Sequence, residues 1–347
     1  MAHHILLTGG NGFIGSHILA QLLDRGFTVC CPVRSKSKGD KILNDFSTQK
    51  SQIDISIIPD IVAPGAFDEV LTNSSFDTVI HTASPFIYGT VESNLEFLDP
   101  AIKGTLNLLN AVKGHAPSVK RVIYTSSCAS VVNYDLLTSD PPQDLTEDDW
   151  NPIEWEEAVN GDQSKAYRAS KKFAEQAAWK FMDEEKPNFD LVTLCPPATF
   201  GPLRHSISSI KDLNESNFRL WRLCTQSGKD APVPYIPVHT YIDVRDFANI
   251  QVQAMLVPEA GNKRFIACAS QFSFQDVCDV LRTNFGELDE RVPLGKTGVS
   301  SLPPGAYTCD NSRVRKILGV EFRDLEETVA DLGRQLLEIE KNENGGV

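Results

Sequence analysis

The stretch Thr8-Gly9-Gly10-Asn11-Gly12-Phe13-Ile14-Gly15 joins two regular segments near the start of this 347-residue chain. The apolar run Ile5–Thr8 before it predicts a buried strand, and the amphipathic run Phe13–Asp24 after it predicts a helix. In the spacing G-x-x-G-x-x-G, Gly9 would allow a tight turn, Gly12 would let the backbone approach a pyrophosphate, and Gly15 would let helix and strand pack closely. The N–H groups at a helix N-terminus attract phosphate. This strand–turn–helix unit therefore predicts dinucleotide binding.

Further strands and helices alternate along the first half of the chain. The predicted strands are Ile5–Thr8, Phe27–Val33, Ile53–Ile58, Thr78–His81, Arg121–Thr125 and Leu191–Leu194. The helices predicted after Phe13–Asp24 are Asn94–Val112 and Ser164–Glu184. Apolar strands separated by amphipathic helices indicate a parallel sheet covered on both faces. The predicted fold class is therefore α/β, a Rossmann-type doubly wound parallel sheet.

The pattern changes after Pro196-Pro197, which indicates a second, smaller C-terminal lobe. We expect this lobe to bind the substrate. Leu203–Pro237 and Gly295–Gly305 read as irregular, with helices predicted at Asp243–Leu256 and Phe274–Phe285. The chain is expected to return to the sheet near Thr240–Val244. The predicted division is a nucleotide-binding domain over residues 1–195 plus about 238–258, a smaller lobe over about 196–237 and 259–340, and a polar tail over 341–347.

Composition limits the classes of function. The 33 basic and 46 acidic residues give a net charge of −13, which argues against nucleic-acid binding. No apolar run approaches the roughly 20 residues that a membrane span needs. The eight cysteines form no C-x-x-C pair, no signal peptide precedes the first strand, and the histidines lack metal-ligand spacing. We expect a cytoplasmic protein with reduced thiols, without a metal, acting as a monomer or homodimer on a small molecule.

The residues after the second predicted strand select the dinucleotide. An NAD-binding protein places an acidic residue there against the ribose 2′-hydroxyl, whereas this chain has Pro32-Val33-Arg34-Ser-Lys-Ser-Lys38 and no acid before Asp40. A guanidinium at Arg34 suits a 2′-phosphate and stacks on adenine. A solvated basic loop is the alternative reading. The sequence predicts NADPH.

Tyr167 and Lys171 lie four residues apart, so a helix would place them on one face. A free tyrosine has a pKa of about 10, and a positive charge about 5 Å away supplies about 3 kcal/mol toward lowering it at an effective dielectric of about 20. This pair could supply a proton to a carbonyl oxygen near neutral pH. Tyr-x-x-x-Lys also occurs by chance on solvated helices.

Ser127 ends the fifth predicted strand, at the sheet edge where open α/β folds place their ligands. Its hydroxyl could polarise the same carbonyl oxygen while hydride arrives from a nicotinamide. Paired serines at a strand end are also common as helix caps and turns.

In their order along the chain, these motifs resemble those of the extended short-chain dehydrogenases/reductases, nearly end to end. Within that family they are most similar to the dihydroflavonol-reductase-like branch and its fungal NADPH-dependent methylglyoxal and ketone reductases. The carriers are the glycine motif, Val33-Arg34-Ser with Lys38, Pro59-Asp60-Ile61, His81-Thr-Ala-Ser-Pro85-Phe86, Thr125-Ser126-Ser127, Tyr167 with Ser170-Lys171-Lys172-Phe173-Ala174-Glu175, Phe200-Gly201-Pro202 and Tyr241-Ile242-Asp243-Val244-Arg245-Asp246.

The resemblance implies a role for each matching residue. Ser127, Tyr167 and Lys171 would be the catalytic triad. The cofactor would contact Gly9, Gly12, Phe13, Ile14, Gly15, Arg34, Lys38, Asp60, Ile61, Thr82, Ala83, Tyr167, Lys171, Pro196 and Thr199, with Ala198 nearby. The substrate would contact Phe86, Ser127, Asn133 and Tyr167, although Asn133 is displaced by one residue from the asparagine of the plant enzymes. His81, Asp243 and Arg245 are expected to have structural roles.

The predicted function is NADPH-dependent reduction of a ketone or aldehyde to an alcohol, with facial selectivity. An alternative enzyme reduces a larger cyclic ketone, flavonoid- or steroid-like. Arg34 argues against a nucleotide-sugar epimerase, which usually carries an NAD-selecting acid. A non-catalytic NADPH sensor is a further alternative, but it would have no need for Tyr167.

Overall fold

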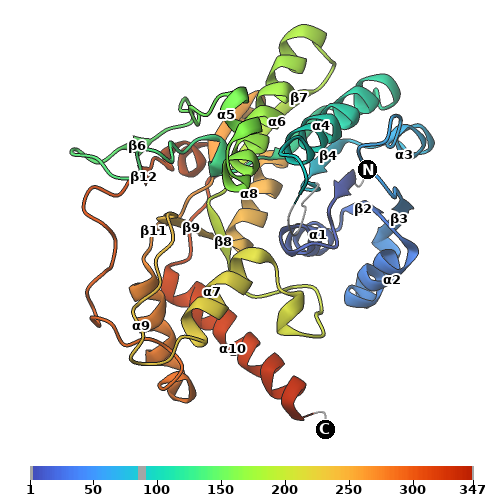
Figure 1. Ribbon diagram of the computed structural model, residues 1–347. Coiled ribbons are helices and arrows are strands. Elements are labelled where there is room, and N and C mark those ends of the chain that lie inside the picture. The colour runs from blue at the N-terminus through green and yellow to red at the C-terminus, as the bar shows by residue number, and fades with distance from the viewer. Residues whose placement is uncertain (1–2, 85–90, 346–347) are drawn as a thin grey trace.

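A parallel seven-stranded sheet forms the centre of the molecule (Figure 1). The computed structural model describes residues 3–84 and 91–345, and the side chains up to 343. In spatial order the strands are β10 (Lys263–Ile266), β7 (Asp190–Cys195), β5 (Arg121–Thr125), β4 (Thr78–His81), β1 (His4–Thr8), β2 (Thr28–Val33) and β3 (Ile53–Ile57). The order reverses between β1 and β4, where doubly wound sheets bind their ligands. The predicted fold class is confirmed.

Alternate side chains of each strand enter two separate cores. In β1, Ile5 and Leu7 enter one core and Leu6 enters the other, as the two-residue period of a strand requires. The first core is covered by α1 (Phe13–Asp24), α2 (Lys36–Asp45) and α8 (Val244–Leu256). The second is covered by α3 (Asp68–Asn73), α4 (Leu95–His115) and α6 (Gln163–Glu185). Helices therefore shield both faces of the sheet.

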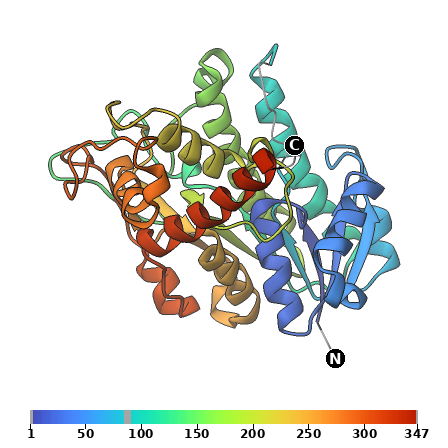
Figure 2. The same ribbon diagram turned by 90° about the horizontal axis from the view of Figure 1, so that it is seen from below.

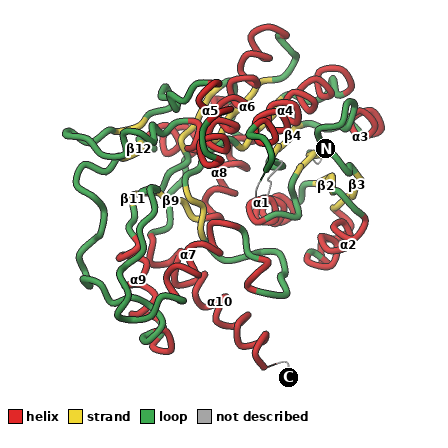
Figure 3. Tube along the Cα trace, viewed as in Figure 1, coloured by secondary structure: helices red, strands yellow, loops and turns green. Residues whose placement is uncertain are grey.

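A third core lies outside the main sheet. It joins α7 (Glu215–Thr225), α9 (Phe274–Asn284) and α10 (Leu325–Gly345) to a small sheet made of β8 (Ala198–Phe200), β9 (Thr240–Asp243) and β11 (Ser270–Gln271). Figures 1 and 2 show these C-terminal helices gathered on the side of the molecule away from β2 and β3. Figure 3 shows long loops around β9, β11 and β12 (Thr308–Cys309). The remaining elements are α5 (Trp155–Asn160) and β6 (Asp144–Leu145), which pairs with β12.

The strand that returns to the main sheet differs from the predicted one. Thr240–Asp243 belongs to the small sheet as β9, whereas the returning strand is β10, which pairs with β7. β10 was missed because Lys263 and Arg264 do not fit the apolar pattern of a buried strand. Arg264 is nevertheless buried, since it forms an ion pair with Glu175.

Two more segments are more regular than predicted. The stretch Leu203–Pro237 contains α7, whose Leu220, Trp221 and Cys224 are buried at helical spacing. Most of the predicted polar tail, residues 341–345, continues α10. Within the described residues, no helix is long and apolar enough to cross a membrane.

Candidate active site

A cavity of about 1060 Å³ opens at the carboxyl ends of the central strands. It extends from the glycine turn after β1 to the face of α6 that carries Tyr167. Predicted site residues that line it are Gly9, Gly12, Phe13, Ile14, Gly15, Arg34, Lys38, Ile61, Thr82, Ala83, Ser127, Tyr167, Lys171, Pro196 and Thr199. One cavity therefore brings together most of the residues that the sequence singled out.

The glycine turn has no room for side chains. Gly9 adopts a φ of +74°, and a Cβ there would lie 2.4 Å from the Thr82 hydroxyl oxygen. A Cβ on Gly15 would lie 2.0 Å from the carbonyl oxygen of Gly9. Gly15 therefore packs against the turn itself, whereas the sequence predicted close packing of helix against strand. Gly12 is the N-cap residue of α1, and the first turn of α1 carries no acidic residue. The N-terminus of α1 therefore suits a phosphate.

Two cations at one end of the cavity fit a phosphate group. Arg34 follows β2 and Lys38 lies on α2; both are exposed, and neither has a carboxylate partner among the described residues. Neighbouring Lys36, by contrast, donates to Asp40 across 2.8 Å. Arg34 and Lys38 are therefore available to an anionic ligand, as a 2′-phosphate requires.

Tyr167 and Lys171 meet on one face of α6 at the other end. The Lys171 Nζ lies 5.4 Å from the centroid of the Tyr167 ring and donates to the Ser84 hydroxyl across 2.7 Å. Burial lowers the pKa of Lys171 to about 8. The ammonium is thus mostly protonated at pH 7.

Ser127 follows β5 and begins the short 3₁₀ helix η2 (Cys128–Ser130). Its hydroxyl oxygen accepts a hydrogen bond from the Ala129 N–H across 3.1 Å. The structure shows that Ser127 caps a helical turn and that its half-buried side chain also lines the cavity, whereas its role toward a carbonyl oxygen stays a prediction.

A buried carboxylate beneath the cavity connects four elements, and the sequence analysis assigned it no role. Glu175 lies one turn beyond Lys171 on α6 and is fully buried. It accepts hydrogen bonds from the hydroxyls of Ser126 at 2.6 Å, Ser130 at 2.6 Å and Thr193 at 2.7 Å, and from the Arg264 Nε at 2.8 Å.

Glu175 is held ionised within this network. Burial would raise its pKa, but the Arg264 guanidinium and the two serine hydroxyls hold the pKa below its usual value. Because Ser126 and Ser130 flank Ser127, the network ties α6 to the segment that carries this hydroxyl. The helical spacing Tyr167, Lys171, Glu175 was visible in the sequence, whereas the Arg264 partner, 89 residues away along the chain, was not.

The residues predicted to be structural do have structural contacts. The Nδ1 of buried His81 lies 2.7 Å from the Thr8 hydroxyl, and burial together with the Lys171 charge lowers the pKa of His81 to about 4. Asp243 caps α8 by accepting from the Arg245 N–H across 2.7 Å.

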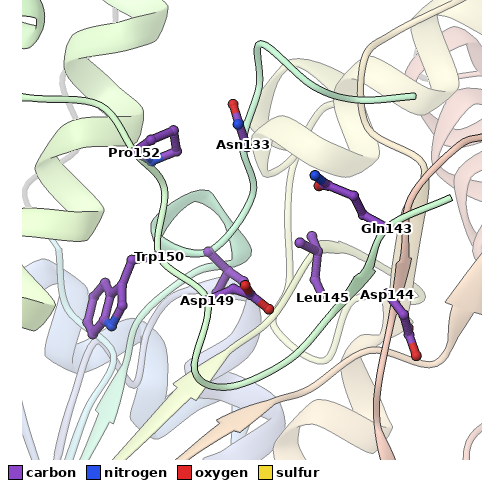
Figure 4. A pocket seen from close by; sticks show the side chains of 8 residues that line it. Asn133, Gln143, Asp144, Leu145, Asp149, Trp150 and Pro152 are labelled. Atoms are coloured by element: carbon purple, nitrogen blue, oxygen red, sulfur yellow. The ribbon is translucent and has the colours of Figure 1, made fainter. Parts of the chain in front are cut away.

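Two predicted contact residues within the described part of the chain do not line this cavity. Among the described residues that line it, Asp60 and Asn133 are absent, and the Asp60 carboxylate instead accepts from the Val62 N–H across 2.9 Å. Asn133 lines a separate hollow of about 340 Å³, with Gln143 and Asp149 (Figure 4). Its neighbour Tyr134 faces the main cavity. Phe86 lies outside the described residues.

Several further residues that the sequence did not predict also line the cavity. These residues are Tyr134, Arg168, Ile236, Val238, Phe274 and Tyr307. Apart from Arg168, which follows Tyr167 on α6, they come from irregular segments or from elements distant in sequence. A mostly apolar wall with a few polar groups suits a small organic molecule.

Comparisons with known proteins identify relatives over the whole length of the chain. Residues 5–268 match the NAD dependent epimerase/dehydratase family. Ketoreductase azaE of Aspergillus niger is 41% identical over 340 residues, covering 97% of this chain and 98% of that protein. NADPH-dependent methylglyoxal reductase GRE2 of Saccharomyces cerevisiae is 36% identical over 344 residues, covering 97% and 98%.

A solved structure supports the family match and the two sequence relatives. The crystal structure of yeast methylglyoxal/isovaleraldehyde reductase Gre2 complexed with NADPH superposes with a TM-score of 0.90 at 34% identity, covering 97% of this chain and 99% of that one. The chain therefore belongs to the NAD dependent epimerase/dehydratase family of extended short-chain dehydrogenases/reductases, and its relatives there include fungal reductases of the Gre2 type.

Proposed function

We propose that this protein is an NADPH-dependent reductase that converts a ketone or an aldehyde into an alcohol. The observation that carries the proposal is the shared cavity: a glycine turn suited to phosphate lies at one end, and Tyr167 with Lys171 and Ser127 lies at the other. The names of the fungal relatives support the same reaction class.

The residues present fit the cofactor. Gly9, Gly12 and Gly15 leave the backbone open to a pyrophosphate, and Arg34 with Lys38 would hold a 2′-phosphate. Lys171 would hold the nicotinamide ribose, and Pro196 and Thr199 would lie beside the nicotinamide, as the family resemblance implies. When bound, NADPH would supply the hydride for the carbonyl carbon.

Arg34→Ala is expected to weaken NADPH binding about 10- to 100-fold, because a hydrogen-bonded charge pair contributes about 1.5–3 kcal/mol. NADH binding should change far less, since NADH has no 2′-phosphate. Fluorescence titration of both cofactors measures the difference. Lys36→Ala, at the start of α2 two residues away, is the control, because Lys36 is already paired with Asp40. Equal losses for NADPH and NADH would contradict the assignment.

The chain's own residues would complete the reaction by handling the oxygen. The Tyr167 hydroxyl would donate a proton to the carbonyl oxygen, and the Ser127 hydroxyl would donate a hydrogen bond to the same atom. The Lys171 ammonium would lower the pKa of Tyr167, because a unit charge at about 5 Å supplies about 3 kcal/mol at an effective dielectric of about 20.

The proposed double role of Lys171 predicts a pH dependence. As the pH rises through about 8, the folded-state pKa of this ammonium, Lys171 loses its charge and its attraction for the cofactor. In a Tyr167→Phe background, where the phenol no longer titrates, NADPH affinity should fall about fivefold between pH 7 and pH 9.5.

Lys171→Ala in that same background should bind NADPH weakly and without this pH step, and in the native background it should also lose turnover. A pH-independent NADPH affinity in the Tyr167→Phe variant would contradict the role of the charge.

Hydride and proton delivered from fixed sides of one cavity would make the reduction stereoselective. The smaller lobe, residues of about 196–237 and 259–340, would shape the substrate end through Ile236, Phe274 and Tyr307. The eight cysteines are free thiols, which is compatible with the reducing cytoplasm. We propose a cytoplasmic enzyme that acts as a monomer or homodimer.

The proposal is tested by following NADPH absorbance with a panel of diketones, aryl ketones and aldehydes. Turnover with at least one carbonyl compound, much slower with NADH, is the expected result. NADPH binding without turnover on any member of the panel would favour a non-catalytic sensor.

A further inference from the structure

One cation in the cavity is not explained by cofactor binding. The cationic residues that line the cavity are Arg34, Lys38, Lys171, Arg219 and Arg168. The first two suit the 2′-phosphate, and Lys171 accompanies Tyr167. Arg219 donates to Glu215 across 2.7 Å, and Glu215 is the only acidic residue among the described residues of the lining. Among the described cations of the lining, Arg168 alone then has neither a carboxylate partner nor a role in the proposed binding of the cofactor.

The side chain of Arg168 is positioned by an aromatic ring. Its guanidinium carbon lies 3.7 Å from the centroid of the Tyr134 ring, so one face of the guanidinium is stacked. Both residues line the cavity and both are half-buried. Within the described part of the chain, Arg168 forms no ion pair and no hydrogen bond. Stacking fixes the plane of the group and leaves its N–H edge available to a ligand.

We propose that Arg168 binds a carboxylate of the substrate, so that the compounds reduced best are oxo acids, with a carbonyl and a carboxylate in one molecule. The inference rests on the proposed carbonyl reduction. A carboxylate matches the N–H fork of a guanidinium with two parallel hydrogen bonds, and partial burial strengthens the attraction.

The position of Arg168 suits this role. Arg168 and Tyr167 both lie on α6 and both line the same cavity, so an anchored carboxylate would share that cavity with the proton donor. In the reaction, the carbonyl carbon gains the hydride and its oxygen gains the proton of Tyr167, while NADPH is oxidised to NADP⁺. The carboxylate is unchanged and serves only to orient the molecule. Arg168 is therefore a specificity-determining residue.

The test compares acids with their own esters. The probes are phenylglyoxylate, 4-oxopentanoate and 5-oxohexanoate, each beside its methyl ester, at saturating NADPH. For at least one chain length, the wild-type enzyme should have a higher kcat/KM for the acid. Arg168→Met should lower that value about 10- to 100-fold, mainly through KM, and should leave the ester within about twofold.

Arg222→Met is the matched control. Arg222 also lies over an aromatic ring, 5.4 Å from the centroid of Phe218, but it does not line the described cavity. Arg222→Met should leave kcat/KM for both the acids and the esters unchanged.

Three results would overturn the role of Arg168 while carbonyl reduction itself stands: faster turnover of every ester than of its acid, equal losses for acid and ester in Arg168→Met, or weakened NADPH binding in that variant. Absence of NADPH oxidation with all six compounds and with simple aldehydes would instead contradict the proposed function, and this inference with it.

Discussion

Tyr167→Phe is expected to lower kcat for carbonyl reduction about 10²- to 10⁴-fold, the range that a positioned general acid contributes. The substitution removes one oxygen atom and keeps the ring that lies 5.4 Å from the Lys171 Nζ, so the cavity and the cofactor contacts should persist. NADPH affinity should therefore remain close to that of the wild type. Steady-state absorbance gives kcat, and fluorescence titration gives the cofactor Kd.

The control for this variant is Tyr235→Phe. Tyr235 is 62% exposed and does not line the described cavity, so removing its hydroxyl should leave most of the activity. If Tyr167→Phe retained more than about a tenth of the wild-type kcat, a general acid at this position would be contradicted.

Arg264→Met is expected to lower the free energy of unfolding by about 3–5 kcal/mol, because it leaves the buried carboxylate of Glu175 without its charged partner. Glu175→Ala should cost a similar amount, since Arg264 would then be buried unpaired. Urea unfolding with an unchanged m-value measures both losses. The variant protein that remains folded should also have a lower kcat, because Glu175 ties α6 to Ser126 and Ser130 on either side of Ser127.

A double variant separates the charge from the packing. Glu175→Met combined with Arg264→Met removes both charges and should recover part of the loss of either single variant. Lys36→Ala breaks an exposed pair with Asp40 and should change stability by less than about 0.5 kcal/mol. A loss below about 1 kcal/mol on removing Arg264 would contradict the view that the pair holds the sheet to α6.

Local patterns predicted six strands and the three longest helices of the nucleotide-binding half of the chain, but not α2 and α3. The bounds of Phe13–Asp24, Thr78–His81 and Arg121–Thr125 agree with the structure to the residue. Continuous apolar strands, helical periodicity and a glycine turn are each encoded within a few neighbouring residues. The proposed catalytic pair could be picked out for the same reason, because Tyr167 and Lys171 lie one helical turn apart.

The features that were missed depend on contacts between distant segments. Arg264 is acceptable as a buried residue of the edge strand β10 only because Glu175, far away in sequence, is buried opposite it. In the loop after Ser127, Tyr134 lines the cavity and Asn133 does not. This choice depends on the path of an irregular backbone, and no periodicity in the sequence specifies that path. Tyr307 reaches the same cavity from a segment 140 residues away from Tyr167. The substrate end could therefore not be derived from the sequence.

The proposed reaction is tested most sharply by tracing an isotope. NADPH carrying deuterium at one or the other C4 position is supplied with a ketone that the panel identifies as a substrate, and the alcohol is examined by mass spectrometry and chiral chromatography. We predict one deuterium on the carbinol carbon, from only one of the two labelled cofactors and in one enantiomer. If the alcohol carried no deuterium with either labelled cofactor, direct hydride transfer in this cavity would be contradicted.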